Sequence, residues 1–204
     1  SGTAFVTSAP SYSNSSVVAG TSGADVIDAA YVDLNGNEVD AGDGTGPLGN
    51  EDTIHAGDGN DSVEAGLEDD LVYGGGGADT LEGGSGNDTI YGDSDGVLPG
   101  GVAGADSILG GSGNDLIFGE DGADIIRGNG NNDTIYGGDG ADNIRGDGGA
   151  DTLNGGDGND RLNGGGGDDI LDGGGNNDVL TSGGGDDVLT GGSGDDTLAG
   201  GRGK

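Results

Sequence analysis

"GGSGNDTIYG", residues 83–92, contains the pattern that organises the rest of the sequence: glycines, then an aspartate, then one aliphatic residue. The pattern recurs as "GGSGNDLIFG" at 110–119 and as "GGDGNDRLNG" at 155–164. Its aspartates are nine residues apart, except for one interval of eighteen in which Val97 takes the expected position. The series comprises Asp52, Asp61, Asp70, Asp79, Asp88, Asp106, Asp115, Asp124, Asp133, Asp142, Asp151, Asp160, Asp169, Asp178, Asp187 and Asp196.

An aliphatic side chain follows each of these aspartates two residues later. The set comprises Ile54, Val63, Val72, Leu81, Ile90, Ile108, Ile117, Ile126, Ile135, Ile144, Leu153, Leu162, Leu171, Leu180, Leu189 and Leu198. The single break is Pro99, in the same repeat as Val97. A random acidic linker would not keep an aliphatic residue at a fixed distance from aspartate. The nine-residue period therefore predicts an ordered repeat architecture.

Composition alone would indicate a disordered chain. The 204 residues include 55 glycines, only 29% are hydrophobic, and the formal net charge is -34. Low hydrophobicity with high net charge is typical of disorder. One aliphatic side chain per repeat buries too little surface to offset the entropy lost when glycine-rich backbone is ordered. We therefore expect that the chain needs more than its own core in order to fold. The acidity argues against a nucleic-acid partner, and no apolar run is long enough to predict membrane insertion.

The repeat resembles the nonapeptide GGxGxDxUx of the RTX (repeats-in-toxin) family. The resemblance covers roughly residues 47–203, and an earlier copy, "GTSGADVID", at 20–28 places Asp25 in the same nine-residue frame. Six residues replace a glycine of the pattern, and we expect each to weaken a single turn without breaking the array. They are Glu68, Asn131 and Asn176 at one glycine position, and Glu120, Asn129 and Asp147 at another.

The resemblance implies an all-β fold, a parallel β-roll with calcium ions between stacked turns. Calcium suits such turns because it binds six to eight oxygen atoms from carboxylates and backbone carbonyls. One turn can supply half of that shell and the turn stacked on it the other half. The metal ligands that the resemblance implies are Asp25, Asp52, Asp61, Asp70, Asp79, Asp88, Asp106, Asp115, Asp124, Asp133, Asp142, Asp151, Asp160, Asp169, Asp178, Asp187 and Asp196. The implied cofactor is roughly a dozen calcium ions.

A family roll has two nonapeptides per coil, so each turn would lie above the turn eighteen residues away. One edge would then hold Asp52, Asp70, Asp88, Asp106, Asp124, Asp142, Asp160, Asp178 and Asp196. The other edge would hold Asp61, Asp79, Asp115, Asp133, Asp151, Asp169 and Asp187, with a gap at Val97. Residues 92–105 replace a normal turn, and we expect them to loop outward and interrupt one calcium file.

The same interval assigns surface side chains to the two sheets, with the aliphatic residues as a narrow core between them. One outer face would hold Tyr73, Tyr91, Arg127, Arg145 and Arg161. The other would hold Glu64, Glu82, Phe118, Tyr136 and Asp172. Ordinary cross-strand ladders are the favoured interpretation. The alternative is a basic-aromatic face that contacts an acidic polysaccharide or another copy of the chain.

The limits of the repeat predict three segments. Residues 1–19 are rich in Ser and Thr and lack the repeat, which favours a linker over a strand that caps the roll. Residues 20–46 contain the first repeat and an insertion. Its "DLNGNEVD", at 33–40, is either a hairpin, the favoured interpretation, or a calcium loop. Residues 47–204 are the β-roll, interrupted by a loop at 92–105.

These features predict a calcium-binding module without catalysis of its own. His55 is the only histidine, and no Ser or Cys nucleophile has a base at a suitable spacing. The module would be a structural, stalk, adhesive or surface-assembly segment of an extracellular protein. The alternative is an accessory module of a secreted protease, lipase or polysaccharide epimerase whose catalytic domain lies outside this chain.

The resemblance also implies a location. RTX proteins resemble type I secretion substrates of Gram-negative bacteria. This resemblance implies an extracellular or cell-surface protein that is exported unfolded. The chain starts at Ser1, which predicts a segment processed from a longer parent, and it lacks the family's C-terminal secretion signal. Secretion is therefore expected for that parent.

Overall fold

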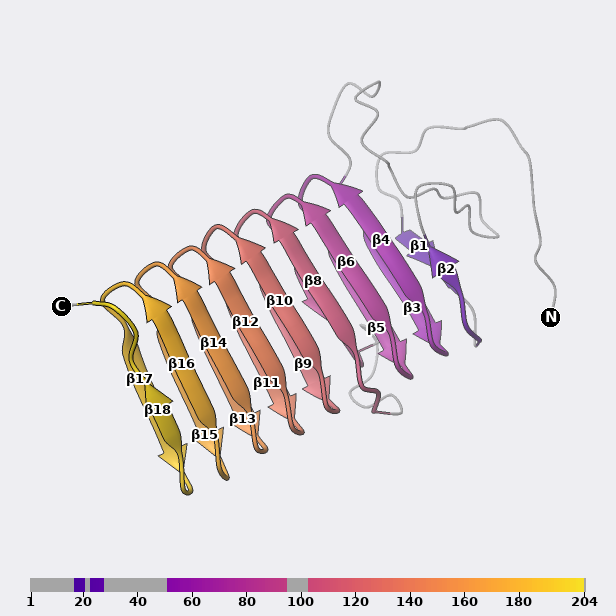
Figure 1. Cartoon of the computed structure of the whole chain (residues 1–204). Coiled ribbons are helices and arrows are strands. Elements are labelled where there is room, and N and C mark those ends of the chain that lie inside the picture. Colours follow the sequence, from indigo (N-terminus) through magenta and orange to yellow (C-terminus); the bar gives the residue numbers. More distant parts are fainter. Residues whose placement is uncertain (1–16, 21–22, 28–50, 95–102, 204) are drawn as a thin grey trace, which may run out of the picture.

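The computed structural model describes residues 17–20, 23–27, 51–94 and 103–203. Every regular element within these residues is a β-strand, and none of them is helical. The strands form two nine-stranded sheets in which all neighbours run parallel, stacked as successive coils (Figure 1). The expected all-β parallel β-roll is confirmed.

Successive repeats supply strands to the two sheets in alternation, so that two repeats make one coil. Sheet A consists, in spatial order, of β1 (Val17–Ala19), β3 (Thr53–Asp58), β5 (Leu71–Gly76), β7 (Thr89–Tyr91), β9 (Leu116–Asp121), β11 (Thr134–Asp139), β13 (Thr152–Asp157), β15 (Ile170–Gly175) and β17 (Val188–Ser193). Sheet B consists of β2 (Val26–Ile27), β4 (Ser62–Leu67), β6 (Thr80–Ser85), β8 (Ser107–Ser112), β10 (Ile125–Gly130), β12 (Asn143–Gly148), β14 (Arg161–Gly166), β16 (Val179–Gly184) and β18 (Thr197–Ala199). Most strands continue beyond the three residues after Asp that the period predicts.

The core between the sheets is a file of aliphatic side chains, one from each strand from β2 onward, joined in β3 and β4 by the buried Ala56 and Ala65. Alternation along a strand turns this residue inward and its two neighbours outward. The buried members are Ile27, Ile54, Val63, Val72, Leu81, Ile90, Ile108, Ile117, Ile126, Ile135, Ile144, Leu153, Leu162, Leu171 and Leu180. The file opens at its last two members, where Leu189 is partly buried and Leu198 is 46% exposed, because no further coil covers them. The expectation that Leu198 lies in the core is therefore wrong.

The register changes at residues 92–105. Elsewhere in the repeat region, paired residues are eighteen apart, as in Ile126 and Ile144. Across this segment they are twenty-seven apart, as in Tyr91 and Phe118. Strands β7 and β8, on either side, are consecutive, so the segment lengthens the chain without adding a strand to either sheet. The strict eighteen-residue interval is wrong at this point, although Val97 and Pro99 themselves lie outside the described residues.

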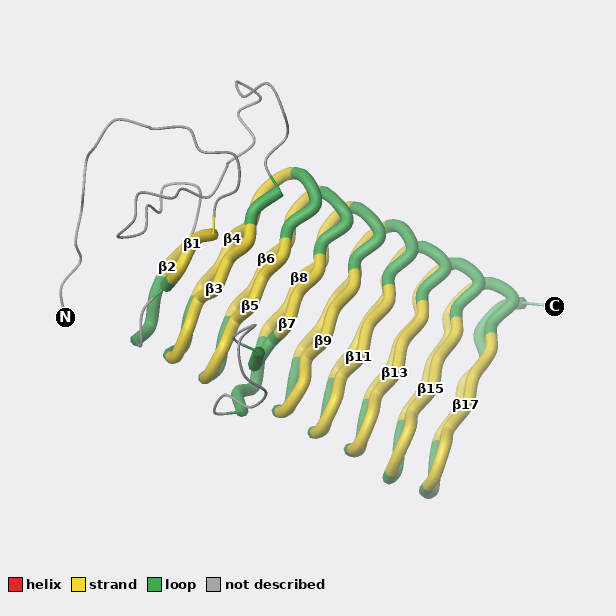
Figure 2. The backbone as a smooth tube through the Cα atoms, turned by 180° about the vertical axis from the view of Figure 1, so that it is seen from behind, coloured by secondary structure: helices red, strands yellow, loops and turns green. Residues whose placement is uncertain are grey.

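The changed register moves every later repeat to the sheet opposite to the expected one. One aromatic ladder results on the outer face of sheet A, with neighbouring ring centroids 4.7 to 5.2 Å apart. It consists of His55, Tyr73, Tyr91, Phe118 and Tyr136. Asp172 belongs to the same sheet, whose strands run side by side in Figure 2. Sheet B instead carries Glu64, Glu82, Arg127, Arg145 and Arg161. The expected basic-aromatic face is therefore absent from the described roll, because its two components lie on different sheets.

The first described residues extend both sheets. Strand β1 pairs with β3, which places Val17–Ala19 at the edge of sheet A. Strand β2 pairs with β4, which places the early repeat around Asp25 on the roll. Residues 1–16 and the insertion with "DLNGNEVD" at 33–40 lie outside the described residues, and the proposed segment boundaries remain predictions.

The six substitutions at glycine positions keep the backbone conformation of the turn. Their φ angles lie between 70° and 79°, in the left-handed region that L-residues usually avoid. They are Glu68, Glu120, Asn129, Asn131, Asp147 and Asn176. The coil geometry therefore overrides the preference of the individual residue, and the array continues through each departure.

Close stacking of the turns yields a prediction for Gly140. This residue has φ of +145°, and a Cβ atom on it would overlap the carbonyl oxygen of Gly122 in the adjacent coil. We expect Gly140→Ala to lower the free energy of unfolding of the calcium-loaded protein by about 2 kcal/mol or more, measured by urea denaturation. Gly166→Ala is the matched control, because nothing lies within 4 Å of its Cβ position, and it should change stability by less than about 0.5 kcal/mol. Equal losses from both variants would contradict this account of the stacking.

Candidate metal centres

The repeating aspartates stand in two files, one along each edge of the roll. One file is Asp52, Asp70, Asp88, Asp115, Asp133, Asp151, Asp169 and Asp187. The other is Asp25, Asp61, Asp79, Asp106, Asp124, Asp142, Asp160, Asp178 and Asp196. The expected edge assignment is wrong beyond Asp88, because the segment at 92–105 exchanges the two edges. Neither file is interrupted there, contrary to expectation.

One carboxylate oxygen of each stacked aspartate has a fixed partner. Its Oδ1 atom accepts a hydrogen bond from the backbone N–H of the aspartate one coil earlier, as Asp142 does from Asp124 at 2.8 Å. Fifteen such bonds join the two files, at 2.6 to 3.0 Å. The aspartate side chains therefore connect successive coils directly, in addition to the ladder bonds of the sheets.

The second oxygen, Oδ2, is buried and has no hydrogen-bond partner. This holds for Asp61, Asp70, Asp79, Asp88, Asp106, Asp115, Asp124, Asp133, Asp142, Asp151, Asp160, Asp169 and Asp178. These side chains are only 1–3% exposed. A buried ionised oxygen without a partner is strongly unfavourable. A cation next to each of these oxygens would remove that cost.

Glycine allows carboxylate and carbonyl oxygens of two coils to approach one another closely. A Cβ atom on Gly119 would lie 2.5 Å from Asp124 Oδ2 and 2.6 Å from the carbonyl oxygen of Gly137 in the next coil. The Oδ2 atoms of other aspartates approach the corresponding glycines in the same way, at Gly74, Gly83, Gly110, Gly128, Gly137, Gly146, Gly155, Gly164, Gly173 and Gly191. Oxygen atoms from two coils thus lie close together beside each glycine, where a side chain would overlap them. Oxygen donors of this kind, carboxylate and carbonyl together, are those that calcium prefers.

Most of the oxygen ligands that a metal ion would need here must come from backbone carbonyl groups. Among the described residues, no group of three or more His, Asp or Glu side chains is close enough to hold a metal ion. Each stacked pair of turns contributes aspartates one above the other, so carbonyl oxygens must complete a shell of six to eight oxygens. The residues present fit calcium in this way and not as a carboxylate cage.

Burial raises the pKa of these carboxyl groups above the ordinary value of 3.8. Desolvation raises the pKa of Asp70 and Asp142 to about 7, and that of Asp79 and Asp160 to about 6. The backbone N–H bond to Oδ1 lowers these pKa values, whereas neighbouring aspartates of the same file raise them. Without a cation, the files therefore favour bound protons over bare charge.

Sequence analysis missed a second set of side chains, directly before the repeating aspartates. Eight Asn or Asp residues there accept a hydrogen bond from the backbone N–H of the matching residue one coil later, at 2.7 to 3.2 Å. They are Asn60, Asp69, Asn87, Asn114, Asn132, Asn159, Asp168 and Asn177. Their constant place directly before a repeating aspartate was the available signal.

Asp93 was also missed, and it explains the continuity of the files. This side chain is 5% exposed and accepts hydrogen bonds from the backbone N–H groups of Gly104, at 2.7 Å, and Asp121, at 2.9 Å. It therefore ties the start of the segment at 92–105 to its end and to the next coil. No periodic signal could have identified it, because Asp93 is out of frame with the repeat.

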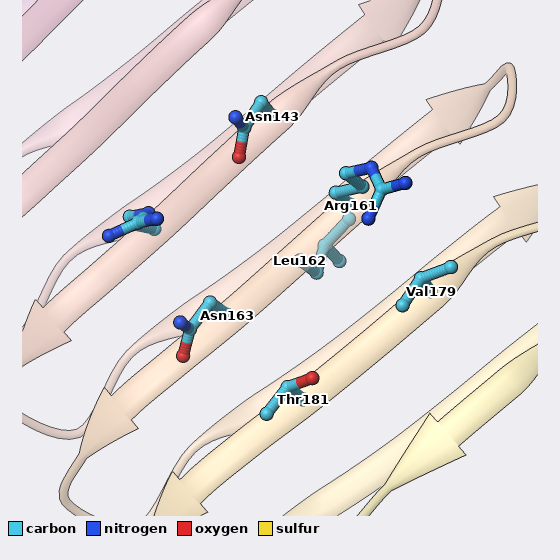
Figure 3. Close-up of a pocket in the computed structure, with 7 residues that line it drawn as sticks. Asn143, Arg161, Leu162, Asn163, Val179 and Thr181 are labelled. Carbon is cyan, nitrogen blue, oxygen red and sulfur yellow. The ribbon is translucent and has the colours of Figure 1, made fainter.

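A shallow depression of about 200 Å³ lies on the outer face of sheet B. Figure 3 shows Asn143, Arg161, Asn163, Val179 and Thr181 along its neighbouring strands. Its volume lies below the roughly 300–1,000 Å³ of a typical small-molecule site. The described residues also contain no helix long and apolar enough to cross a membrane.

Comparison with known families agrees with the geometry of the turns. The model of the RTX calcium-binding nonapeptide repeat, which comprises four copies, matches residues 49–81, 64–96, 100–135, 136–171, 145–180 and 172–204. A comparison with curated proteins finds no match. The matched repeats cover most of the chain and coincide with the strands and turns of the roll, so the chain belongs to the RTX calcium-binding nonapeptide repeat family.

Proposed function

We propose that calcium drives the folding of this chain by occupying the spaces between stacked turns, and that the folded roll serves a structural, stalk, adhesive or surface-assembly role in an extracellular protein. The observation that carries the proposal is the set of buried Oδ2 atoms without a hydrogen-bond partner, repeated along both edges. A divalent cation next to these oxygens removes the cost of their burial. Metal binding would then be coupled directly to folding.

The proposed ligands are the repeating aspartates from Asp25 to Asp196, together with backbone carbonyls of the glycine turns. Each of the fifteen stacked pairs of aspartates is a candidate position for one ion. This revises the expected dozen, because the files are continuous. Ions in that number would nearly balance the net charge of -34, which otherwise opposes compaction.

An extracellular setting suits this chemistry. Calcium modules that work outside cells have dissociation constants of about 10⁻⁴–10⁻³ M. A roll of that affinity would stay unfolded where calcium is scarce and fold where calcium is abundant, which suits export as an unfolded chain by a type I system. Acidic polysaccharide and other copies of the chain are candidate partners for its flat faces.

A role without catalysis is supported by the way the interior is filled. The aliphatic file occupies the space between the sheets, which leaves no room for a buried substrate pocket in the described roll. The same folding chemistry would equally serve an accessory module of a secreted protease, lipase or polysaccharide epimerase. Sequence that flanks this chain in its parent protein would distinguish the two roles.

Circular dichroism during a calcium titration tests the proposal. We expect a coil spectrum without calcium and a cooperative gain of sheet signal with it, whereas magnesium should be far less effective because it demands a smaller octahedral site. Asp124→Asn retains an oxygen that can accept the N–H bond of Asp106 and removes the charge, so its calcium midpoint should rise more than that of Asp139→Asn, an exposed matched control. Full sheet content after chelation would contradict the proposal.

The pKa values predict how acid acts on the metal-free chain. The raised pKa of Asp70, Asp106, Asp133 and Asp142, each about 7 in the roll against 3.8 ordinarily, means that the folded state binds protons more tightly than the unfolded state. Their contribution to stability is complete below the unfolded value and is lost as pH rises through the folded one. Without calcium, sheet content should therefore increase as pH falls from about 8 to about 5. A pH-independent spectrum would show that these carboxyl groups do not limit folding.

A further inference from the structure

The outer face of sheet B carries charges of opposite sign on the two sides of one strand. A single column of outward side chains crosses the successive strands β4, β6, β8, β10 and β12. Its members, in order, are Glu64, Glu82, Leu109, Arg127 and Arg145. The column therefore reads as two negative charges, one apolar residue and two positive charges, centred on β8.

The pattern does not neutralise itself within one roll. Glu64 is directly paired with Glu82, and Arg127 with Arg145, so like charges are neighbours. Like charges directly opposite each other on a sheet are destabilising. The nearest opposite charges, on β6 and β10, are separated by β8 and thus by about 10 Å, which is too far for an ion pair. The four charged side chains are exposed.

A second copy of the chain would satisfy all four charges at once. A two-fold axis that runs parallel to the strands, in the plane between the two faces and over β8, keeps strand direction and reverses the stacking order. Glu64 of one copy then faces Arg145 of the other, Glu82 faces Arg127, and Leu109 faces itself. Isologous contacts of this kind, in which one patch is complementary to itself, are the commonest form of oligomer.

We propose that sheet B is the interface of a calcium-dependent homodimer in which two rolls pack face to face with their axes antiparallel. The inference rests on the proposed function, because calcium must first neutralise the acidic edges before two such chains can approach. Besides the column, the outward side chains of this face include the cationic Arg161 and the neutral Asn143, Val179 and Thr181 (Figure 3).

The dimer should be weak and sensitive to salt. The face is only two outward side chains wide, which is narrow against the roughly 800 Å² per partner of a standard interface. Exposed charge pairs set orientation and specificity more than affinity, and salt screens them. We expect association that is detectable at about 100 µM protein in calcium and lost at about 0.5 M salt.

Charge exchange within the column tests the proposal by analytical ultracentrifugation in calcium. An acidic variant, Arg127→Glu with Arg145→Glu, and a basic variant, Glu64→Arg with Glu82→Arg, should each dimerise at least about tenfold more weakly than the wild type. A mixture of the two should recover a heterodimer. The matched control combines all four substitutions, which preserves the net charge and the symmetry of the pattern, so it should dimerise like the wild type.

The basic variant separates this geometry from a general charge effect. It is less acidic overall than the wild type, so general repulsion alone predicts stronger self-association, whereas the proposed interface predicts weaker self-association. Leu109→Cys provides an independent measurement in a chain without native cysteine. It should form a disulfide-linked dimer on oxidation in calcium, and Thr190→Cys, on the outer face of sheet A, should not.

Each failure has a distinct meaning. Circular dichroism that shows no calcium-induced sheet would remove the proposed function. A calcium-folded wild type that stays monomeric, or variants whose mixture does not re-associate, would overturn the dimer alone. Retention of the wild-type monomer, but not of the acidic variant, on an immobilised acidic polysaccharide would also overturn it and assign the arginines to that ligand.

Discussion

The whole molecule depends on a carboxylate that is buried with only one of its two oxygens bonded. In each turn Oδ1 fastens the previous coil, as Asp160 does for Asp142 at 2.9 Å, while Oδ2 lies against glycine and carbonyl oxygen. A protein would not normally repeat such an arrangement, because every copy adds unpaired charge to a dry position. It would become favourable with a cation shared between coils, as proposed, and the repeat unit of sequence would then also be the repeat unit of metal binding.

Polar contacts carry more of the stacking here than in an ordinary domain. The aliphatic core is one residue wide, as at Ile126 and Ile144. On the turns, the aspartate bonds point to the previous coil, whereas at eight turns the Asn or Asp directly before the aspartate, such as Asn132, accepts from the following one. At those turns, bonds in both directions hold the coil in register with its neighbours. Glycine is needed at positions such as Gly119 and Gly140, because a side chain there would overlap a carboxylate or a carbonyl oxygen.

The period identified the strands, the inward aliphatic residues and the turns with their aspartates, because each depends only on local spacing. The assignment of residues to faces failed, because counting assumes that every nine residues add one strand. Asp93 breaks that assumption by bonding Gly104 and Asp121, which docks the two ends of an extra segment onto the roll. That contact joins residues with no periodic relation. Counting alone therefore placed Tyr91 and Phe118 on different sheets, although their rings stack in one ladder.

The alternation of strands between the two sheets also constrains how such a chain can change over evolutionary time. Loss or duplication of one nonapeptide by unequal recombination would transfer every downstream side chain to the other surface, and so would cut the aromatic ladder and scramble the charges around Leu109. Gains or losses of a whole coil preserve the parity of each surface. Extra residues that leave the strand count unchanged, as at 92–105, also preserve it. Length polymorphism in this lineage should therefore occur in units of two repeats, or as loops.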